Sequence, residues 1–315
     1  MNTKQLRIVG IVVAALVLLY LLFGRDEGFT SRAEAPGIHL SFEGAVTQVD
    51  IRADGSDSTT RIRARPGGWT IDGFMADQAS IDDVLEEFPF SATDLQSHNP
   101  ANHARLGVAD DGRRVTFRTD DGAESAFLLG NAVRRGSGYY ARLPESDEVY
   151  RMDSRLGGPL ARARDDWRQR TITRVDTSLV GSVTLVRDGR TVVLSRSPDG
   201  GWLADGAVPD TEVAAAIGRS VGQLTTVFAS GFPGDKVAAA ADFAGATRSA
   251  DVRDMNGDGQ LLLLRLMRED PEATSGEWLV LVGEGAVASE VFELRDLEVN
   301  RIFPASLFPE ETPDS

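Results

Sequence analysis

The chain contains no cysteine among its 315 residues. Disulfides, thiolate nucleophiles and zinc-thiolate sites are therefore excluded, and so is a lipid-modified N-terminal cysteine. Lysine is confined to Lys4 and Lys236, so nearly every basic residue is an arginine. The 33 basic residues face 48 acidic ones, which gives a net charge of −15. Such a field repels phosphate backbones, so nucleic acid is not expected as a partner.

Motifs of the common catalytic sites are also missing. No Gly-x-Ser-x-Gly, His-Glu-x-x-His or P-loop pattern occurs, and histidine is present at three positions only. Acid pairs such as Asp165-Asp166 could still perform general acid-base chemistry of the kind used in glycoside hydrolysis. We therefore expect a protein that is not an enzyme, with an enzyme acting on envelope glycans as an alternative.

The chain has one long hydrophobic run, from Ile8 to Phe23. Residues 8–24 are long enough for a short transmembrane helix and exceed the apolar core of about 7–15 residues in a signal peptide. Lys4 and Arg7 precede the run, which predicts a cytoplasmic N-terminus and export of the rest. The expected location is the bacterial inner membrane, crossed once, with the bulk of the chain in the periplasm. Cleavage after Ala35 is the alternative.

A repeat organises the rest of the chain. Residues 67–77 read Gly-Gly-Trp-Thr-Ile-Asp-Gly-Phe-Met-Ala-Asp, and residues 200–210 read Gly-Gly-Trp-Leu-Ala-Asp-Gly-Ala-Val-Pro-Asp. The two copies agree at six of eleven positions without a gap. Agreement of this kind at one fixed offset indicates a tandem duplication.

Both copies show the same order of local patterns. Period-two alternation predicts strands before the Trp and again after a helix, and Asp77 and Asp210 are the predicted helix N-caps. The fold class predicted is α+β, with two tandem repeats of a mostly antiparallel sheet, one main helix each, preceded by a single transmembrane helix. The predicted divisions are a cytoplasmic tip and anchor (1–25), a linker (26–37), a first module (38–170), a second module (171–308) and a disordered acidic tail (309–315).

Several short motifs of the first copy occur in a characteristic order. They are Gly-Gly-Trp, the Ala76-Asp77 helix start, Leu106-Gly107-Val108, Leu129-Gly130, Gly138-Tyr139-Tyr140-Ala141-Arg142 and Val149-Tyr150. This set resembles the bacterial domain-of-unknown-function family 4340, over roughly residues 40–310. The second copy keeps the Gly-Gly-Trp repeat, which we call the Trp box, and the helix. It lacks the Leu-Gly and Tyr-Tyr-Ala-Arg elements.

The resemblance implies an exported protein tethered to the inner membrane. Family members are typically encoded beside ABC-transporter permeases and auxiliary components of the gliding-motility type. A membrane-protein partner such as an ABC-transporter permease is therefore expected, in addition to the membrane itself through residues 8–24. The family has no established catalytic residues to transfer to this chain.

One stretch has the beginning of a calcium-binding loop. Asp254, Asn256 and Asp258 follow the D-x-N-x-D-G pattern, in which alternate oxygen side chains converge on one hard cation. The twelfth position, which should supply a bidentate Glu, is Arg265. A hairpin turn is the alternative reading, and no cofactor other than this possible Ca²⁺ is expected.

Between the two copies lies the one basic stretch of an acidic protein. It contains Arg162, Arg164, Arg168, Arg170 and Arg174. These arginines could present a docking surface for an acidic partner, or they could pair with nearby carboxylates. The function expected from the sequence is a binding or scaffolding component of an ABC-transporter or envelope complex. A small-ligand receptor is a further alternative, for which an apolar pocket between the modules would be the sign.

Overall fold

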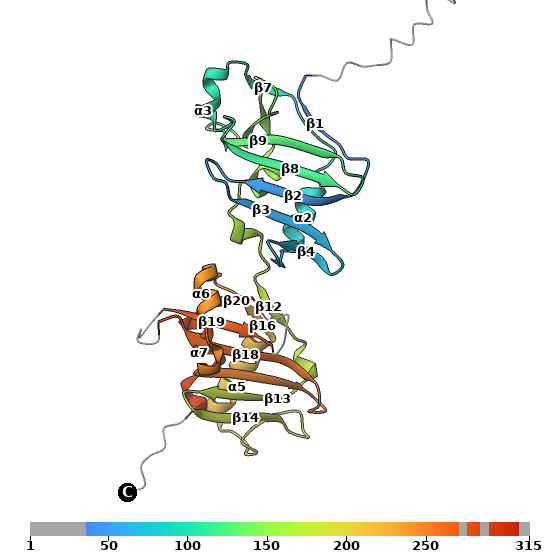
Figure 1. Ribbon diagram of the computed structural model, residues 1–315. Coiled ribbons are helices and arrows are strands. Elements are labelled where there is room, and N and C mark those ends of the chain that lie inside the picture. Colours follow the sequence, from blue (N-terminus) through green and yellow to red (C-terminus); the bar gives the residue numbers. More distant parts are fainter. Residues whose placement is uncertain (1–35, 271–275, 284–289, 309–315) are drawn as a thin grey trace, which may run out of the picture.

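The computed structural model describes residues 36–270, 276–283 and 290–308, which form two sheet modules lying end to end (Figure 1). A single crossing of the chain joins them. Short 3₁₀-helices punctuate the loops: η1 (Pro100–Asn102), η2 (Arg164–Trp167), η3 (Thr177–Leu179), η4 (Phe243–Gly245) and η5 (Ala305–Leu307).

The first module is built on a nine-stranded sheet whose order is β5-β4-β3-β2-β8-β9-β10-β11-β7, with every pair antiparallel. A small pair, β1 with β6, lies beside it. The strands are β1 (Ile38–Leu40), β2 (Val46–Arg52), β3 (Thr59–Arg65), β4 (Gly68–Ile71), β5 (Phe74–Met75), β6 (Phe90–Ala92), β7 (Asp94–Ser97), β8 (Arg113–Thr119), β9 (Glu124–Ala132), β10 (Tyr139–Arg142) and β11 (Val149–Met152). The helices are α2 (Gln78–Leu85), α3 (His103–Leu106) and α4 (Ser154–Leu160).

The second module is built on a seven-stranded antiparallel sheet of order β15-β14-β13-β17-β18-β19-β20, with the pair β12 and β16 beside it. Its strands are β12 (Thr171–Arg174), β13 (Val180–Arg187), β14 (Arg190–Arg196), β15 (Trp202–Ala204), β16 (Thr226–Phe228), β17 (Arg248–Asp254), β18 (Gln260–Arg268), β19 (Glu277–Val282) and β20 (Val291–Arg295). Its helices are α5 (Thr211–Thr225), α6 (Asp235–Ala240) and α7 (Asp296–Ile302).

The two sheets share one strand order. The series β4-β3-β2-β8-β9-β10-β11 in the first module matches β15-β14-β13-β17-β18-β19-β20 in the second. In each module one helix comes after the Trp strand, α2 after β4 and α5 after β15. Another helix directly follows the last strand, α4 after β11 and α7 after β20. Positions in the two copies can therefore be compared through their strand registers.

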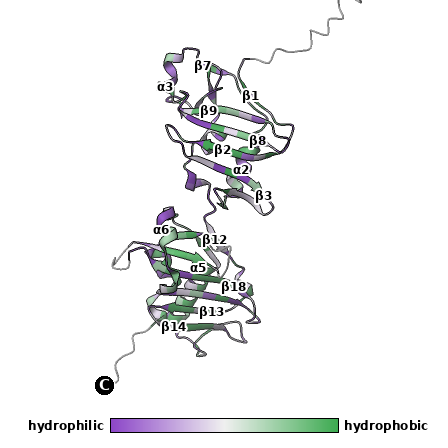
Figure 2. Cartoon of the chain, viewed as in Figure 1, coloured by the Kyte–Doolittle hydropathy of each residue, from purple (hydrophilic) through white to green (hydrophobic). Residues whose placement is uncertain are grey.

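Each sheet buries one face. Hydrophobic and hydrophilic residues alternate along the strands, as Figure 2 shows, so that one set of side chains meets the helices. In the first module this core includes Ile62, Ile81 and Phe117. In the second, α5 lies against the sheet through Ile217 and Leu224.

The Gly-Gly-Trp repeat forms matching turns in both modules. Asp72 and Asp205 both have φ of 48°, in the left-handed region that Asp tolerates better than most residues. The backbone N–H of each Asp donates to the carbonyl of the adjacent strand, at Arg61 (2.9 Å) and Val193 (2.8 Å) respectively. Each carboxylate in turn accepts the N–H of that same residue, at 3.0 and 2.8 Å. The Asp-Gly pair therefore closes a hairpin in each copy.

The fold class predicted from the sequence is wrong on two counts. The transmembrane helix predicted over residues 8–24 falls outside the described residues, and within the described ranges no helix is long and apolar enough to cross a membrane. The longest of these helices, α5, has 15 residues. Its length is about 22 Å, against about 30 Å for a hydrocarbon core. The single-pass inner-membrane location therefore has no support from the structure.

The α+β description with one main helix per module is the second error. The part of the chain that the structure describes is mostly sheet, with 42% strand and 24% helix, and the sheets are multi-stranded. Each module has three α-helices among its described residues, most of them one or two turns long. The physical reason is that most apolar residues alternate with polar ones, a pattern that covers one face of a strand but leaves too few apolar stripes for long helices.

Candidate functional site

The segment between the modules is fixed to the first module by backbone hydrogen bonds. The N–H of Asp77 donates to the carbonyl of Trp167 (2.8 Å), and the N–H of Gln169 donates to the carbonyl of Met75 (3.0 Å). Trp167 is only 1% exposed and belongs to the first core. The segment thus continues the edge of the first sheet and does not behave as a free linker.

The same segment is tied to the second module immediately afterwards. The N–H of Ala229 donates to the carbonyl of Arg170 (2.8 Å), and β12 then pairs with β16. Only Arg168 and Gln169 separate the last residue of the first core from this attachment. Such a short connection, bonded on both sides, restricts how the modules can move against each other.

We call the contact between the two modules the joint, and Arg168 lies at its centre. Its side chain is 4% exposed, and its guanidinium lies between the rings of Phe74 of the first module (4.2 Å) and Phe232 of the second (3.7 Å). It forms an ion pair of 2.9 Å with Glu290 of the second module and lies 3.5 Å from Asp165. Buried cation–π contacts can contribute about 2 kcal/mol each, and a carboxylate beside a buried guanidinium removes the penalty of an unpaired charge.

Two glutamates of the second module at or near this joint have perturbed pKa values. Burial raises the pKa of Glu290, against the opposing effects of Arg168 and the backbone N–H of Met75. Burial also raises the pKa of Glu293, and the neighbouring carboxylates Glu277 and Glu269 add to the effect. At Glu290 burial thus outweighs the opposing effect of Arg168, whereas Glu293 has like charges around it.

The other arginines of the basic stretch serve different contacts. Arg162 donates to the hydroxyl of Ser80 (3.1 Å), and Arg164 pairs with Asp72 (2.7 Å). Arg170 donates to the carbonyl of Ser230 (3.2 Å) and lies 3.5 Å from Asp166, while Arg174 is exposed on β12. The structure therefore does not bring the five arginines together as one exposed patch. Sequence reasoning missed Phe74, Phe232 and Glu290, because nothing in the chain links residues so far apart.

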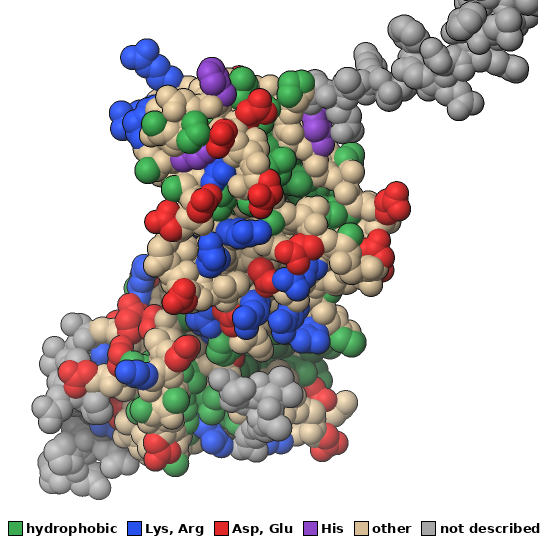
Figure 3. Space-filling model, turned by 45° about the horizontal axis from the view of Figure 1, so that its top comes forward, with side chains coloured by type: hydrophobic (Ala, Val, Ile, Leu, Met, Phe, Trp, Pro, Cys, Tyr) green, Lys and Arg blue, Asp and Glu red, His purple; other side chains and the backbone are tan. Residues whose placement is uncertain are grey.

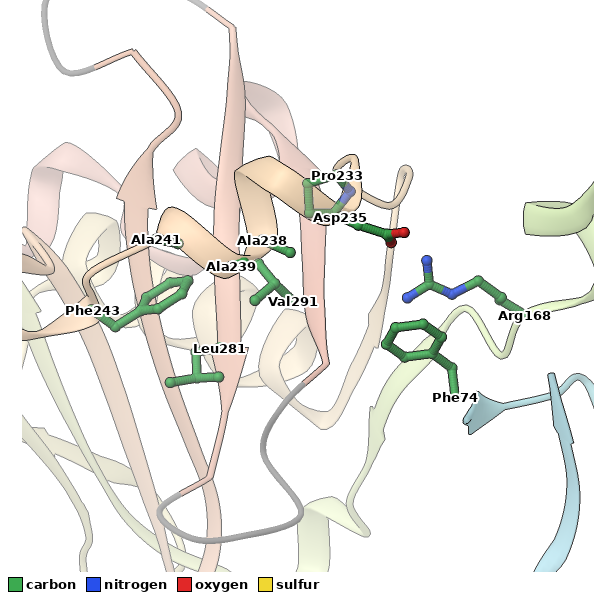
Figure 4. A pocket seen from close by; sticks show the side chains of 10 residues that line it. All are labelled: Phe74, Arg168, Pro233, Asp235, Ala238, Ala239, Ala241, Phe243, Leu281 and Val291. Atoms are coloured by element: carbon green, nitrogen blue, oxygen red, sulfur yellow. The ribbon is translucent and has the colours of Figure 1, made fainter. Parts of the chain in front are cut away.

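A pocket of about 530 Å³ opens beside the joint (Figure 4). Phe74 and Arg168 form one wall, and α6, β19 and β20 form the other with small and apolar side chains. Asp235, at the start of α6, points toward Arg168 and is the single carboxylate among the described lining residues. The pocket is therefore mostly apolar, with one buried cation and one acid near each other at one end.

The calcium-loop residues form a hairpin turn between β17 and β18. The carboxylate of Asp254 accepts the backbone N–H of Asn256 (3.0 Å), and the N–H of Gly257 donates to the carbonyl of Asp254 (3.0 Å). Among the described residues no group of three or more His, Cys, Asp or Glu is placed to hold a metal ion. Whether the turn binds Ca²⁺ stays a prediction.

Three of the motifs that carried the family resemblance meet at one corner of the first module: Leu106-Gly107-Val108, Leu129-Gly130 and Tyr139-Tyr140-Ala141-Arg142. The guanidinium of Arg142 donates to the carbonyl of Val108 (2.8 Å), and Gly130 lies so close to the Leu106 carbonyl that a Cβ there would clash with it. Gly107 ends α3 in the left-handed conformation, with φ of 77°. These elements dock the α3 segment onto the sheet, so their role is structural.

The fold and the joint define a protein of two antiparallel-sheet modules with one strand order and a buried ionic contact between them. Residues 69–243 match the model of a protein family described as a domain of unknown function (DUF4340). The match covers more than half of the chain, so the protein belongs to this family. No curated protein and no solved structure matches the chain.

Proposed function

We propose that this chain is a non-enzymatic binding or scaffolding component of an ABC-transporter or envelope complex. The observation that carries the proposal is the joint, in which Arg168 is buried between two aromatic rings and paired with Glu290. Modules within one chain normally move against each other unless their interface holds them. A scaffold needs a fixed spacing between its binding surfaces, and this joint supplies one.

The proposal of a transporter as partner rests on the family resemblance and not on the geometry of the joint. The test is co-purification of the full chain from a mild-detergent extract of its source cells, followed by reconstitution with the membrane protein that is identified. Recovery of one permease that binds the purified chain supports the proposal. Repeated recovery of the chain alone contradicts it.

The Arg168→Met variant is the matched test of the scaffold argument. If a fixed joint is needed, this variant binds the reconstituted partner more weakly than the wild type. Arg174→Met, at the exposed end of β12, binds as the wild type does. Equal binding by both variants would show that the joint geometry is irrelevant to the partner.

A small-ligand receptor is a second candidate, favoured by the pocket beside Arg168. Its volume of about 530 Å³ and its largely apolar lining fit the range of about 300–1,000 Å³ of small-molecule sites. The fluorescent dye 8-anilinonaphthalene-1-sulfonate offers a direct probe, because it combines aromatic rings with one anionic group. Saturable fluorescence that is lost in Ala239→Trp supports a receptor, and fluorescence unchanged by that substitution excludes this pocket.

A further inference from the structure

Each sheet has an outer face, opposite its main core, and one half of that face is covered. In the first module, the α3 segment packs over the β9 to β11 side through Leu106, Val108 and Leu128. In the second, α6 and η4 cover the β18 to β20 side through Phe243 and Leu279. The other half of each outer face is left open. It is formed by β2, β3 and β8 in the first module and by β13, β14 and β17 in the second.

The open half of the first sheet carries a grid of arginines. Residues directly opposite one another in a register share a face, and the pairs include Asp50 with Arg61, Gln48 with Arg63, Arg52 with Arg114, and Gln48 with Arg118. Arg65 lies on the same face, two residues after Arg63. Figure 3 shows basic side chains gathered over this side of the first module. We call this set the arginine face: Arg52, Arg61, Arg63, Arg65, Arg114 and Arg118.

Pairing within the chain explains only half of the arginine face. Arg52 donates to the carbonyl of Asp110 (3.3 Å), and Arg63 donates to the side-chain oxygen of Gln48 (3.1 Å). Asp50 and Glu124 lie 3.8 and 3.2 Å from Arg118. The side chains of Arg61, Arg65 and Arg114, however, form no ion pair or hydrogen bond with any residue that the structure describes. Arg52 and Arg114 are directly opposite one another, an arrangement of like charges that destabilises a sheet.

The second copy shows that the fold does not require arginine here. By register, Arg52 corresponds to Val186, Arg61 to Val193, Arg63 to Ser195, Arg114 to Ser249 and Arg118 to Arg253. Five positions therefore hold one arginine in the second sheet, and that one is paired with Asp251 at 3.1 Å. Valine and serine satisfy the same strands, so a role outside the fold accounts for the arginines.

We propose that the arginine face is a docking surface for a carboxylate-rich segment of a partner protein. Alternate residues along a strand are about 6.7 Å apart and neighbouring strands about 4.8 Å apart, so Arg61, Arg63 and Arg65 match acids at alternate positions of an extended segment. Each guanidinium can bind a carboxylate with two parallel N–H donors. This inference rests on the proposed function and names the chemistry of its partner.

The charge of the whole molecule favours a protein segment over a polyanion. The net charge of −15 repels DNA and anionic membranes at long range, where their fields extend over many charges. A short acidic segment that reaches the face directly makes contact within the screening distance of about 8–10 Å, where the local arginines dominate.

The test uses the full chain and a short fluorescent peptide of alternating Glu and Thr, with a Gln-Thr peptide of the same length as control. The face variant carries Arg61→Val, Arg63→Ser and Arg114→Ser, the residues of the second copy. The charge-matched control variant carries Arg134→Ser, Arg135→Ser and Arg174→Ser, at exposed positions away from the face. Circular dichroism melting checks that both variants remain folded.

The expected result is binding of the Glu-Thr peptide by the wild type and the control variant, with affinity about ten-fold weaker or more in the face variant. Binding weakens at high salt. Three outcomes overturn the proposal: no preference for the Glu peptide over the Gln peptide, equal binding by the face and control variants, or face-dependent binding of duplex DNA or phosphatidylglycerol vesicles in place of the peptide.

The two proposals fail separately. A permease that co-purifies with the face variant as well as with the wild type leaves the scaffold proposal standing and removes the arginine face as its contact. Face-dependent peptide binding by a chain that recovers no membrane protein keeps the docking surface and removes the transporter partner.

Discussion

Arg142 is a buried arginine whose donors are all directed at acceptors of one corner. It is 4% exposed and donates to the carbonyls of Val108 (2.8 Å), Pro144 (3.1 Å) and Ser146 (2.9 Å), and to the carboxylate of Asp110. The Tyr-Tyr-Ala-Arg motif was a mark of the family in the sequence, and the structure shows why an arginine is needed there. It holds the segment after α3 against the sheet.

Replacing Arg142 with Leu should cost about 3 kcal/mol of unfolding free energy, because one buried and two partly buried carbonyls lose their donor. Urea unfolding measures the change. Arg155→Leu is the control, since its side chain is 74% exposed and its ion pairs of 3.5 and 3.6 Å contribute little. Similar losses in the two variants would contradict the structural role of Arg142.

The contribution of Glu293 to the stability of the fold should depend on pH. Burial and the nearby carboxylates Glu277 and Glu269 raise its pKa in the folded protein. The folded protein holds the proton of such a carboxyl group more tightly than the unfolded chain does, in which its pKa is near 4.5. The fold therefore loses stability as the pH rises from this unfolded pKa through the folded pKa. Glu293→Gln should therefore raise the melting temperature at pH 7, by about 2 °C, and leave it unchanged at pH 4. Thermal melts at both pH values test this, with Glu145→Gln on the surface as control.

At the scale of elements, turn chemistry and alternation could be predicted from the sequence. The strands predicted after the helix of each copy include β8 (Arg113–Thr119) in the first module and β18 (Gln260–Arg268) in the second. β17 (Arg248–Asp254) was not predicted, nor were β1, β6, β12 and β16. Four of these strands have only three or four residues, and β17 has Arg248 at a buried position. Their pairing with distant strands, not their local composition, defines them.

The same substitution in the two Asp-Gly turns should have different effects on stability. Asn tolerates the left-handed conformation and its amide oxygen still accepts a backbone N–H, so Asp205→Asn should change stability by less than about 0.5 kcal/mol. Asp72→Asn should cost about 1 kcal/mol more, because Asp72 also pairs with Arg164 at 2.7 Å. Urea unfolding compares the two, and in an Arg164→Gln background the difference should vanish. A difference that persists there would exclude Arg164 as its cause.

At the scale of the whole molecule, the joint decides how the two modules are related. Arg168 lies between Phe74 and Phe232, and its ion pair with Glu290 links residues 122 positions apart. In the sequence, Arg168 belongs to a basic stretch that could dock a partner or pair with acids. The structure places it inside the molecule, where both rings and the carboxylate are already engaged.

Arg168→Met should loosen the joint, because it leaves Glu290 without its counter-charge in a buried place, at a cost of about 3 kcal/mol. We expect a larger radius of gyration in small-angle X-ray scattering and faster hydrogen exchange at the N–H of Ala229, which bonds Arg170 across the joint. The double variant Arg168→Met, Glu290→Gln should recover part of the loss. A scattering profile unchanged in Arg168→Met would show that the backbone bonds alone hold the modules.

The sequence by itself determined the features that depend on neighbours in the chain: the repeated Trp box, the Asp-Gly turns, many of the strands and membership of the family. Only the tertiary structure decided the mostly sheet character, the burial of Arg168 and the gathering of arginines on one face. Arg61 and Arg114 share a face because β2 pairs with both β3 and β8. Alternation places each arginine on one side of its own strand, but only pairing between distant strands brings those sides together.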